Sequence, residues 1–222
     1  MKRANAMHTP RSRAEPKAGY HHGDLPRALV AAATRLIDEG AGGHVTLRAA
    51  AIAAGVSIAA PYRHFESREA LLAAALAEGF RDLTRRTDQA RRAAPDPLEA
   101  LVASGTAYVR FAADRPRLYR LMFGPECDKA SFPELMQAGH ESLGVVQQAV
   151  ADARVGLGIA EADVQRIALT GWALTHGLAS LYVDGLLADA CTPADLDATA
   201  HGMVVTLIEG LRKRPGANRR AR

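Results

Sequence analysis

Apolar residues recur at every third or fourth position along most of the chain, which is the spacing of one face of an α-helix. The alternating pattern of a half-buried strand is missing, alanine is abundant and aromatic residues are few. The pattern therefore predicts an all-α protein of about nine helices, over residues 24–40, 46–54, 57–65, 67–94, 97–114, 117–123, 133–155, 162–187 and 192–211.

Several of these bounds coincide with residues that favour helix ends. Thr46, Ser67 and Thr192 can each accept a backbone N–H at the start of a helix. Asp24 stands just before Pro26, as is typical of a first helical turn. The sequence thus predicts short helices near the N-terminus and longer ones after residue 67.

The segment 46–65 predicts two short helices joined by a tight turn. Gly55 can take the left-handed conformation that ends the first helix, and Ser57 is the expected N-cap of the second. The small side chain of Ala51 lets the two helices cross closely at a steep angle. This arrangement is typical of a helix-turn-helix unit, which presents its second helix to DNA.

Four motifs stand here in fixed register: Thr46-Leu47-Arg48, Ala54-Gly55-Val56-Ser57, Tyr62-Arg63-His64-Phe65 and Ser67-Arg68-Glu69-Ala70-Leu71. Over about residues 20–76 they resemble the N-terminal domain of the tetracycline-repressor (TetR) family of bacterial transcription regulators. The resemblance implies a three-helix DNA-binding domain, expected at 20–67, and a larger helical domain for effector binding and dimerisation, expected at 68–213. Residues 1–19 and 214–222 are expected to be disordered basic segments.

The same resemblance implies which side chains contact DNA. Tyr62 and His64 match residues that contact phosphates, and Arg68 lies beside them as a phosphate clamp. Arg48 matches a position that reaches bases in some relatives. Thr46 matches a phosphate-contacting hydroxyl, although capping is its expected main role. The full set is Thr46, Arg48, Ser57, Ile58, Ala59, Ala60, Tyr62, Arg63, His64 and Arg68.

The second predicted helix departs from the family pattern. Relatives often have polar residues where this chain has Ile58, Ala59 and Ala60, which can only touch thymine methyls or allow a close backbone approach. Direct base readout would then fall to Arg48 and Arg63. Pro61, where leucine is common, lacks an N–H and is tolerated only near a helix start.

A second resemblance lies in residues 162–187, which are apolar nearly all round and so predict burial on more than one side. Trp172, His176 and Gly177 resemble the Trp-x-x-x-His-Gly signature of the ligand-binding domain in one branch of the family. Trp172 and His176 share a helix face, and two interpretations are open. Either Trp172 is core and His176 a buried, hydrogen-bonded histidine, or His176 faces an effector pocket. The candidate pocket residues are Tyr108, Phe111, Met122, Phe123, Met136, Trp172 and His176.

The formal charge of +4 conceals an uneven distribution, since residues 1–23 carry a net +4 and the C-terminus from Arg212 a net +6. A basic N-terminal arm can follow phosphates or a minor groove, or it can be a solvated, disordered tail. For the C-terminus we prefer the second interpretation.

Metal, cofactor and membrane association are not expected. Cys127 and Cys191 lack metal-binding spacing, and His21-His22 has no third ligand nearby. The start of the chain does not have the apolar core of a signal peptide. The longest uncharged run, Ile167 to Val183, has 17 residues, fewer than the ~20 of a membrane span. We expect a cytoplasmic protein with reduced thiols.

The leading hypothesis is a repressor that binds a palindromic double-stranded DNA operator and is released by a small-molecule effector of unknown identity. It would be a homodimer through its last two helices, as the resemblance implies. An architectural DNA-binding protein is a second hypothesis, and an enzyme with a fused DNA module is a third. Scattered histidines and surface carboxylates give no catalytic arrangement, so we expect no enzyme.

Overall fold

The computed structural model describes residues 25–187 and 190–213. The predicted arm 1–19, the His21-His22 pair, the Asp24 cap and the tail 214–222 lie outside these residues. Within them the chain forms eight α-helices and no strand. Their bounds are α1 Leu25–Leu36, α2 Leu47–Ala54, α3 Arg68–Ala93, α4 Pro97–Asp114, α5 Pro116–Phe123, α6 Pro133–Leu157, α7 Val164–Val183 and α8 Leu196–Arg212.

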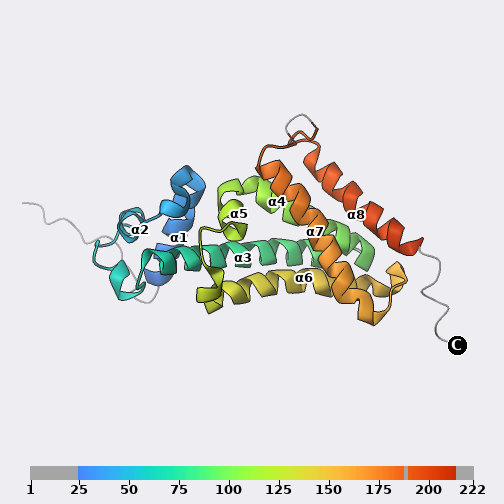
Figure 1. The fold of residues 1–222 in the computed structure, drawn as a ribbon, viewed down its shortest axis with the longest axis horizontal. Coiled ribbons are helices and arrows are strands. Elements are labelled where there is room, and N and C mark those ends of the chain that lie inside the picture. Colours follow the sequence, from blue (N-terminus) through green and yellow to red (C-terminus); the bar gives the residue numbers. More distant parts are fainter. Residues whose placement is uncertain (1–24, 188–189, 214–222) are drawn as a thin grey trace, which may run out of the picture.

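The longest helix, α3, connects the two ends of the molecule (Figure 1). It packs on α1 near its start, and on α4 and α6 over most of its length. Helices α7 and α8 lie beyond α4 and contact it along their lengths. One helix therefore joins α1 and α2 to the other helices.

Two clusters of buried apolar residues form the core. The larger one extends from α1 and α2 through α3 into α5 and part of α7 and includes Leu29, Leu76 and Phe111, all fully buried. The smaller one lies between α4, α6, α7 and α8 and includes Val150, Leu157 and Ile208. The apolar residues of α3 that recur at helical spacing (Leu71, Leu72, Ala75, Leu76, Phe80 and Leu83) are all buried.

The predicted helix ends are partly confirmed. The Thr46 hydroxyl accepts the Ala49 N–H at 3.1 Å, and the Ser67 hydroxyl accepts the Ala70 N–H at 3.1 Å. Asp96 caps α4 by accepting two backbone N–H groups, a cap that the pattern analysis did not identify.

The predicted cap at Thr192 is wrong. Helix α8 begins at Leu196, because Thr192 takes part in a turn instead. Its N–H donates to Asp195 Oδ2 at 3.2 Å, and its carbonyl accepts the Asp195 N–H at 3.0 Å. The first helix also ends early, at Leu36, and a π-helical turn (Ile37–Ala41) follows it, with Gly40 at φ 116°.

No helix in the described ranges is both long and apolar enough to cross a membrane. Cys127 and Cys191 are buried, free thiols.

Candidate DNA-binding surface and internal cavity

Helix α2 is fixed at both ends by local hydrogen bonds. Thr46 caps its start, and Gly55 ends it in the left-handed conformation at φ 70°. The Val56 N–H then donates to the Ala51 carbonyl at 3.0 Å, which holds the turn against the helix. The buried side chains of Ala50 and Ala51 leave room for the close approach of α1. The turn is therefore part of a rigid unit.

The segment after this turn is not the α-helix predicted over 57–65. Residues 57–60 form a turn and Pro61–Arg63 form one 3₁₀ turn. The Ala60 N–H donates to the Ser57 carbonyl at 3.0 Å and the His64 N–H to the Pro61 carbonyl at 2.9 Å, both three residues back. Pro61 explains the change, because it has no N–H to donate to Ser57 as an α-helix requires. This missing α-helix accounts for the ninth helix of the sequence analysis.

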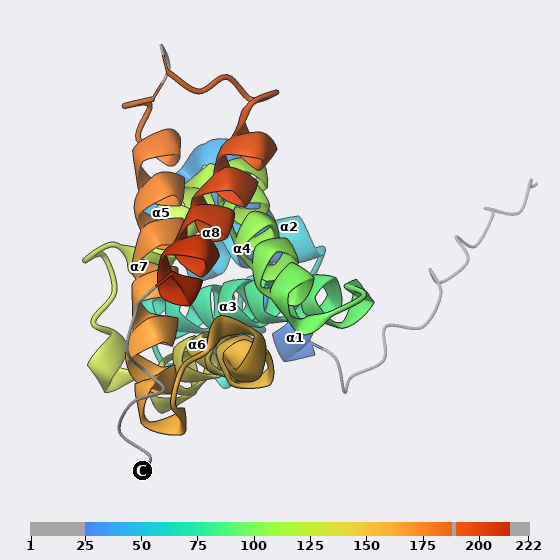
Figure 2. The same cartoon turned by 90° about the vertical axis from the view of Figure 1, so that its right-hand side faces the viewer.

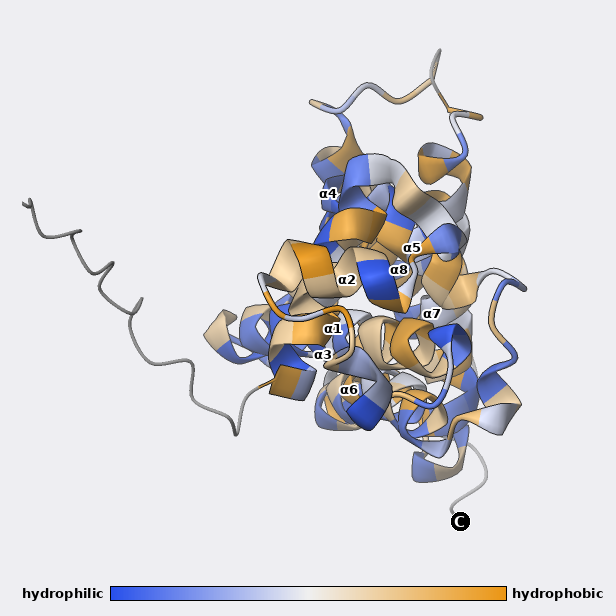
Figure 3. Cartoon of the chain, turned by 90° about the vertical axis from the view of Figure 1, so that its left-hand side faces the viewer, coloured by the Kyte–Doolittle hydropathy of each residue, from blue (hydrophilic) through white to orange (hydrophobic). Residues whose placement is uncertain are grey.

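Most of the predicted DNA contacts lie exposed at this end of the molecule. Thr46, Arg48, Ser57, Ile58, Ala59, Tyr62, Arg63 and His64 are exposed, whereas Ala60 and Arg68 are half-buried. Tyr62 is 63% exposed and Ile58 46%. Figure 3 views the molecule from this end, where apolar colours cover most of α2. Among the exposed residues, Ile52, Ile58 and Ala59 are apolar, so the exposed cations lie near apolar side chains.

Arg68 already has partners within the protein. Its Nη1 donates to the Gly43 carbonyl, and its guanidinium pairs with Glu69 at 3.1 Å. These contacts tie the start of α3 to the segment before α2. A phosphate contact by Arg68 stays a prediction, and it would compete with these bonds.

A cavity of about 270 Å³ lies at the other end, lined by residues of α3, α4, α5, α6, α7 and α8. Its wall is mainly apolar and includes Phe80 of α3, Leu101 of α4, Val150 of α6 and Ile208 of α8. A space of this size in an otherwise packed interior is close to the lower limit of small-molecule sites.

Three of the seven candidate pocket residues, Tyr108, Phe123 and Trp172, line this cavity. The other four do not belong to the wall that the described residues form. Phe111 and Met122 are fully buried in the larger core, and Met136 is 38% exposed on the outer side of α6. The amphipathic spacing alone could not distinguish a wall residue from a core residue, because both are apolar and face inward.

His176, the last of the four candidates outside the wall, belongs to a polar cluster next to the cavity. Its Nδ1 lies 3.0 Å from the Tyr108 hydroxyl and 2.8 Å from the Tyr119 hydroxyl, and its Nε2 lies 3.5 Å from Ser180 Oγ. Burial lowers the pKa of His176 below its ordinary value of 6.5 and raises the pKa of both tyrosines. His176 is half-buried and hydrogen-bonded while Trp172 lines the cavity, so the role of this pair in effector binding stays a prediction.

Comparisons with known proteins match both the helices near the candidate DNA-binding surface and the helices around the cavity. Residues 29–75 match the family model described as "Bacterial regulatory proteins, tetR family", and residues 101–207 match "Tetracyclin repressor-like, C-terminal domain". The chain belongs to the TetR family. It is a DNA-binding transcription regulator and not an enzyme.

Solved structures share the TetR fold over most of the chain. A protein of unknown function from Rhodococcus sp. RHA1 is 33% identical, with 89% of this chain and 100% of that chain covered and a TM-score of 0.75. FadR from Bacillus subtilis, solved in complex with stearoyl-CoA, is 16% identical, with 83% and 98% covered and a TM-score of 0.65. A TetR family transcription regulator from Marinobacter aquaeolei VT8 is 16% identical, with 83% and 95% covered and a TM-score of 0.58. No curated protein matches the sequence.

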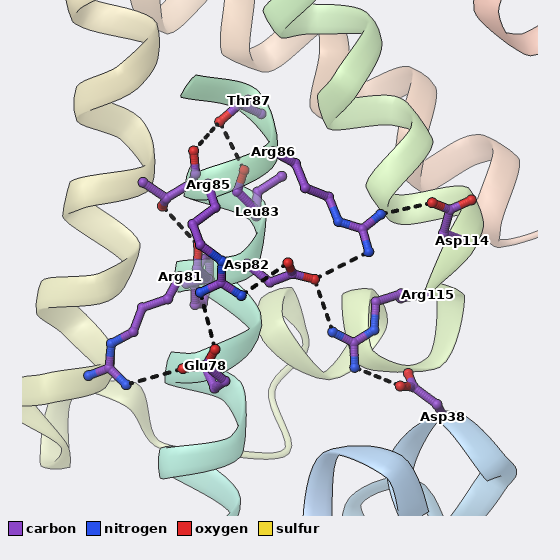
Figure 4. A network of polar contacts seen from close by, with 12 residues as sticks. Asp38, Glu78, Arg81, Asp82, Leu83, Arg85, Arg86, Thr87, Asp114 and Arg115 are labelled. Carbon is purple, nitrogen blue, oxygen red and sulfur yellow. Dashed lines mark hydrogen bonds and ion pairs between the residues drawn. The ribbon is translucent and has the colours of Figure 1, made fainter. Parts of the chain in front are cut away.

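In this TetR-family chain, ion pairs join the segment after α1 to α3 and to the junction of α4 and α5 (Figure 4). Arg115, between α4 and α5, pairs with Asp38 at 2.6 Å and with Asp82 of α3 at 3.2 Å. Arg117 donates to the Asp38 backbone carbonyl at 2.6 Å. Arg115 and Asp82 are each 18% exposed, so solvent screens their pair less than a surface pair. Sequence reasoning missed this junction because Asp38 and Arg115 lie 77 residues apart.

Proposed function

We propose that the protein is a cytoplasmic, homodimeric repressor that a small-molecule effector releases from a near-palindromic operator. The observation that carries this proposal is the pairing of the exposed residues between Thr46 and His64, here called the reading segment, with an apolar cavity towards the opposite end of α3. We assign residues 20–67 to the DNA-binding domain and 68–213 to the effector and dimerisation domain. Trp172, His176 and Gly177 support placing the second domain in the Trp-x-x-x-His-Gly branch.

Two kinds of DNA contact follow from the exposed residues. Arg48 and Arg63 carry the donors that can read guanine edges in the major groove. Thr46, Tyr62 and His64 have hydroxyl or imidazole groups suited to phosphates, which position the protein without reading sequence. Ile58, Ala59 and Ala60 allow a close approach and contact with thymine methyls.

The second subunit would cover the outer face of α7 and α8. These helices lie side by side on one face of the molecule (Figure 2). In the single chain Leu169 is 53% exposed, Leu174 38% and Leu181 44%, although the sequence of α7 is apolar nearly all round. A four-helix seam with a second copy would bury these residues. It would also place two reading segments about one DNA turn apart, ~34–36 Å.

Effector binding would act on DNA affinity through α3 and α5. Helix α3 contributes Phe80 and Thr87 to the cavity wall and begins directly after the reading segment. Helix α5 carries Tyr119, which contacts His176, and Arg115 next to it holds Asp38 at the end of the first helix. A coupling free energy of about 1–3 kcal/mol would reduce operator affinity roughly 5–150-fold. The FadR structure with stearoyl-CoA supports the use of this fold for ligand binding.

Selection of bound duplexes from a random pool tests the proposal. We expect a symmetric motif with half-sites one helical turn apart. Leu181→Glu should dissociate the dimer and abolish binding to that motif, because it places a charge in the seam. Val155→Glu is the matched control, since Val155 is 81% exposed and lies on α6, a helix outside the proposed seam.

Sedimentation of both variants, together with gel shifts on the selected duplex, gives the result. An asymmetric motif, or a wild-type protein that binds the duplex as a single subunit, would contradict the homodimer. Equal affinity for all duplexes, lost on removal of the basic tails, would indicate an architectural protein instead.

A further inference from the structure

The cavity wall has few polar groups, and none of its residues, all within the described ranges, is Lys, Arg, Asp or Glu. A charged ligand group inside it would lose its hydration without gaining an ionic partner. Burial also keeps the nearby His176 neutral, because its pKa lies below the ordinary value. The polar wall residues are Thr87, Ser104, Tyr108, His140, Ser142 and Thr175, and Trp172 adds an indole N–H donor.

Most of these polar groups already have partners or reach water. The Thr87 hydroxyl donates to the Leu83 carbonyl at 2.9 Å, and the Thr175 hydroxyl donates to the Gly171 carbonyl at 3.1 Å. Tyr108 contacts His176. His140 is exposed at the rim and Ser142 is half-buried.

Ser104 differs from all of them. It lies on α4, is only 5% exposed, and its hydroxyl makes no hydrogen bond to any residue that the structure describes. Asp38 Oδ1 is the only fully buried side-chain polar atom without a partner among the described residues, so the Ser104 oxygen is open to the cavity. A polar group that lines a cavity without a partner favours a ligand that supplies one. Because Ser104 faces the cavity, a molecule inside it can supply the missing partner.

We propose that the cavity binds an uncharged, largely apolar molecule whose one hydrogen-bonding group, such as a carbonyl or hydroxyl oxygen, pairs with Ser104. This inference rests on the proposed function, since the cavity is the effector site named there. It specifies the chemical class of the effector: a ketone, ester or alcohol with an apolar body fits the wall, and a free carboxylate or ammonium inside the cavity does not.

Three probes of similar shape test the proposal on the full-length protein by isothermal titration calorimetry. Valerophenone has a ketone, pentylbenzene has a methylene in its place, and 5-phenylpentanoate has a carboxylate. We expect valerophenone to bind best, and the carboxylate at least about 30-fold more weakly, because its charge must be desolvated. The single tryptophan, Trp172, lines the cavity, so its emission reports whether the probe occupies this site.

Ser104→Ala should weaken valerophenone binding about fivefold, the loss expected for one hydrogen bond, and leave pentylbenzene binding unchanged. The protein should keep its thermal stability, because the deleted hydroxyl has no partner in the free protein. Thr175→Val removes a hydroxyl from the same wall whose hydrogen bonds are already made within α7. We expect that variant to retain the preference for the ketone.

Equal affinities of Ser104→Ala and wild type for valerophenone would overturn the role of Ser104. Carboxylate binding as tight as ketone binding, or no saturable binding of any probe to protein that still binds its operator, would overturn the ligand class. If the ketone binds as expected but operator affinity does not change, the ligand class stands and effector release under the proposed function fails.

Discussion

The two halves of α3 are packed in opposite ways. Towards its start, Leu71, Leu72 and Leu76 are buried without space around them, and they support the short helices that carry the exposed reading residues. Further along, Phe80 and Thr87 border a cavity of about 270 Å³. Recognition of a rigid duplex needs side chains held in fixed positions on the outside, whereas recognition of a small molecule needs room inside.

The same difference determines where function depends on single residues. At the DNA end Arg48, Tyr62 and Arg63 are exposed, so their removal should leave the fold intact. By contrast, Thr46 and Arg68 also make hydrogen bonds that hold the fold. At the cavity end the working groups are part of the packing, so a change there alters stability and binding together. Three predictions test this contrast, beginning with the largest expected effect.

Arg48→Ala should remove discrimination at one base pair of the selected operator, by about 1–3 kcal/mol, without loss of stability. Arg48 is exposed and can form two hydrogen bonds to a guanine edge. Competition gel shifts with operators altered at single positions measure the effect, and circular dichroism melts check the fold.

Tyr62→Phe is the comparison variant at the same end. It deletes a single hydroxyl expected to contact a phosphate, so affinity should fall by a similar factor for operator and random duplexes. If Arg48→Ala lost the same affinity on both kinds of duplex, Arg48 would be a phosphate contact and not a base reader.

Two glycines compare a packed site with a site beside the cavity: Gly79 lies on α3 against α5, and Gly139 lies on α6 in the cavity wall. A Cβ at Gly79 would lie 2.8 Å from Met122 Sδ and 3.1 Å from Leu118 Cδ2, whereas at Gly139 the nearest atom is Phe80 Cζ at 4.0 Å. Alanine in a helix interior is favoured over glycine by about 0.5–1 kcal/mol. Gly139→Ala should therefore stabilise the protein by about that amount, while crowding at Gly79 should make Gly79→Ala destabilising by about 1 kcal/mol.

Urea unfolding of both variants measures these changes. Since the two substitutions are chemically identical, only their surroundings can give them opposite signs. Stabilisation by both would show that α5 packs less tightly on α3 than the structure indicates.

The smallest expected effect is a change in the pH dependence of stability. Burial lowers the folded-state pKa of His176, so near its ordinary value of 6.5 the unfolded chain takes up a proton that the folded one does not. The stabilising contribution is fully present above about pH 7 and is lost as the pH falls through this window. His176→Gln should therefore show a shallower fall in melting temperature between pH 7 and pH 5.

His201→Gln is the control, because His201 is an exposed histidine on α8. Its melting temperature should follow the wild-type profile. A His176→Gln profile parallel to that of the wild type would mean that the imidazole is not buried as a neutral group.

Much of the fold could be predicted from local pattern. Three residues that start or end helices, Thr46, Gly55 and Ser67, make their hydrogen bonds with residues no more than four positions away. Their roles could therefore be predicted from the neighbouring sequence. The predicted cap at Thr192 was wrong because the Asp195 side chain accepts the Thr192 N–H and holds these residues in a turn. The helix expected after Ser57 failed because one missing N–H at Pro61 outweighed the favourable pattern around it.

The sequence by itself determined the helices, their apolar faces and the motif that identifies the reading end, because these depend on contacts between residues a few positions apart. Only the tertiary structure decided which inward-facing residues meet each other and which border empty space. Phe111 and Phe123 carry the same side chain, yet one fills the core and the other lines the cavity. The pairing of Arg115 with Asp38 and the unpaired hydroxyl of Ser104 likewise depend on helices distant in the chain, whose crossings a local pattern does not encode.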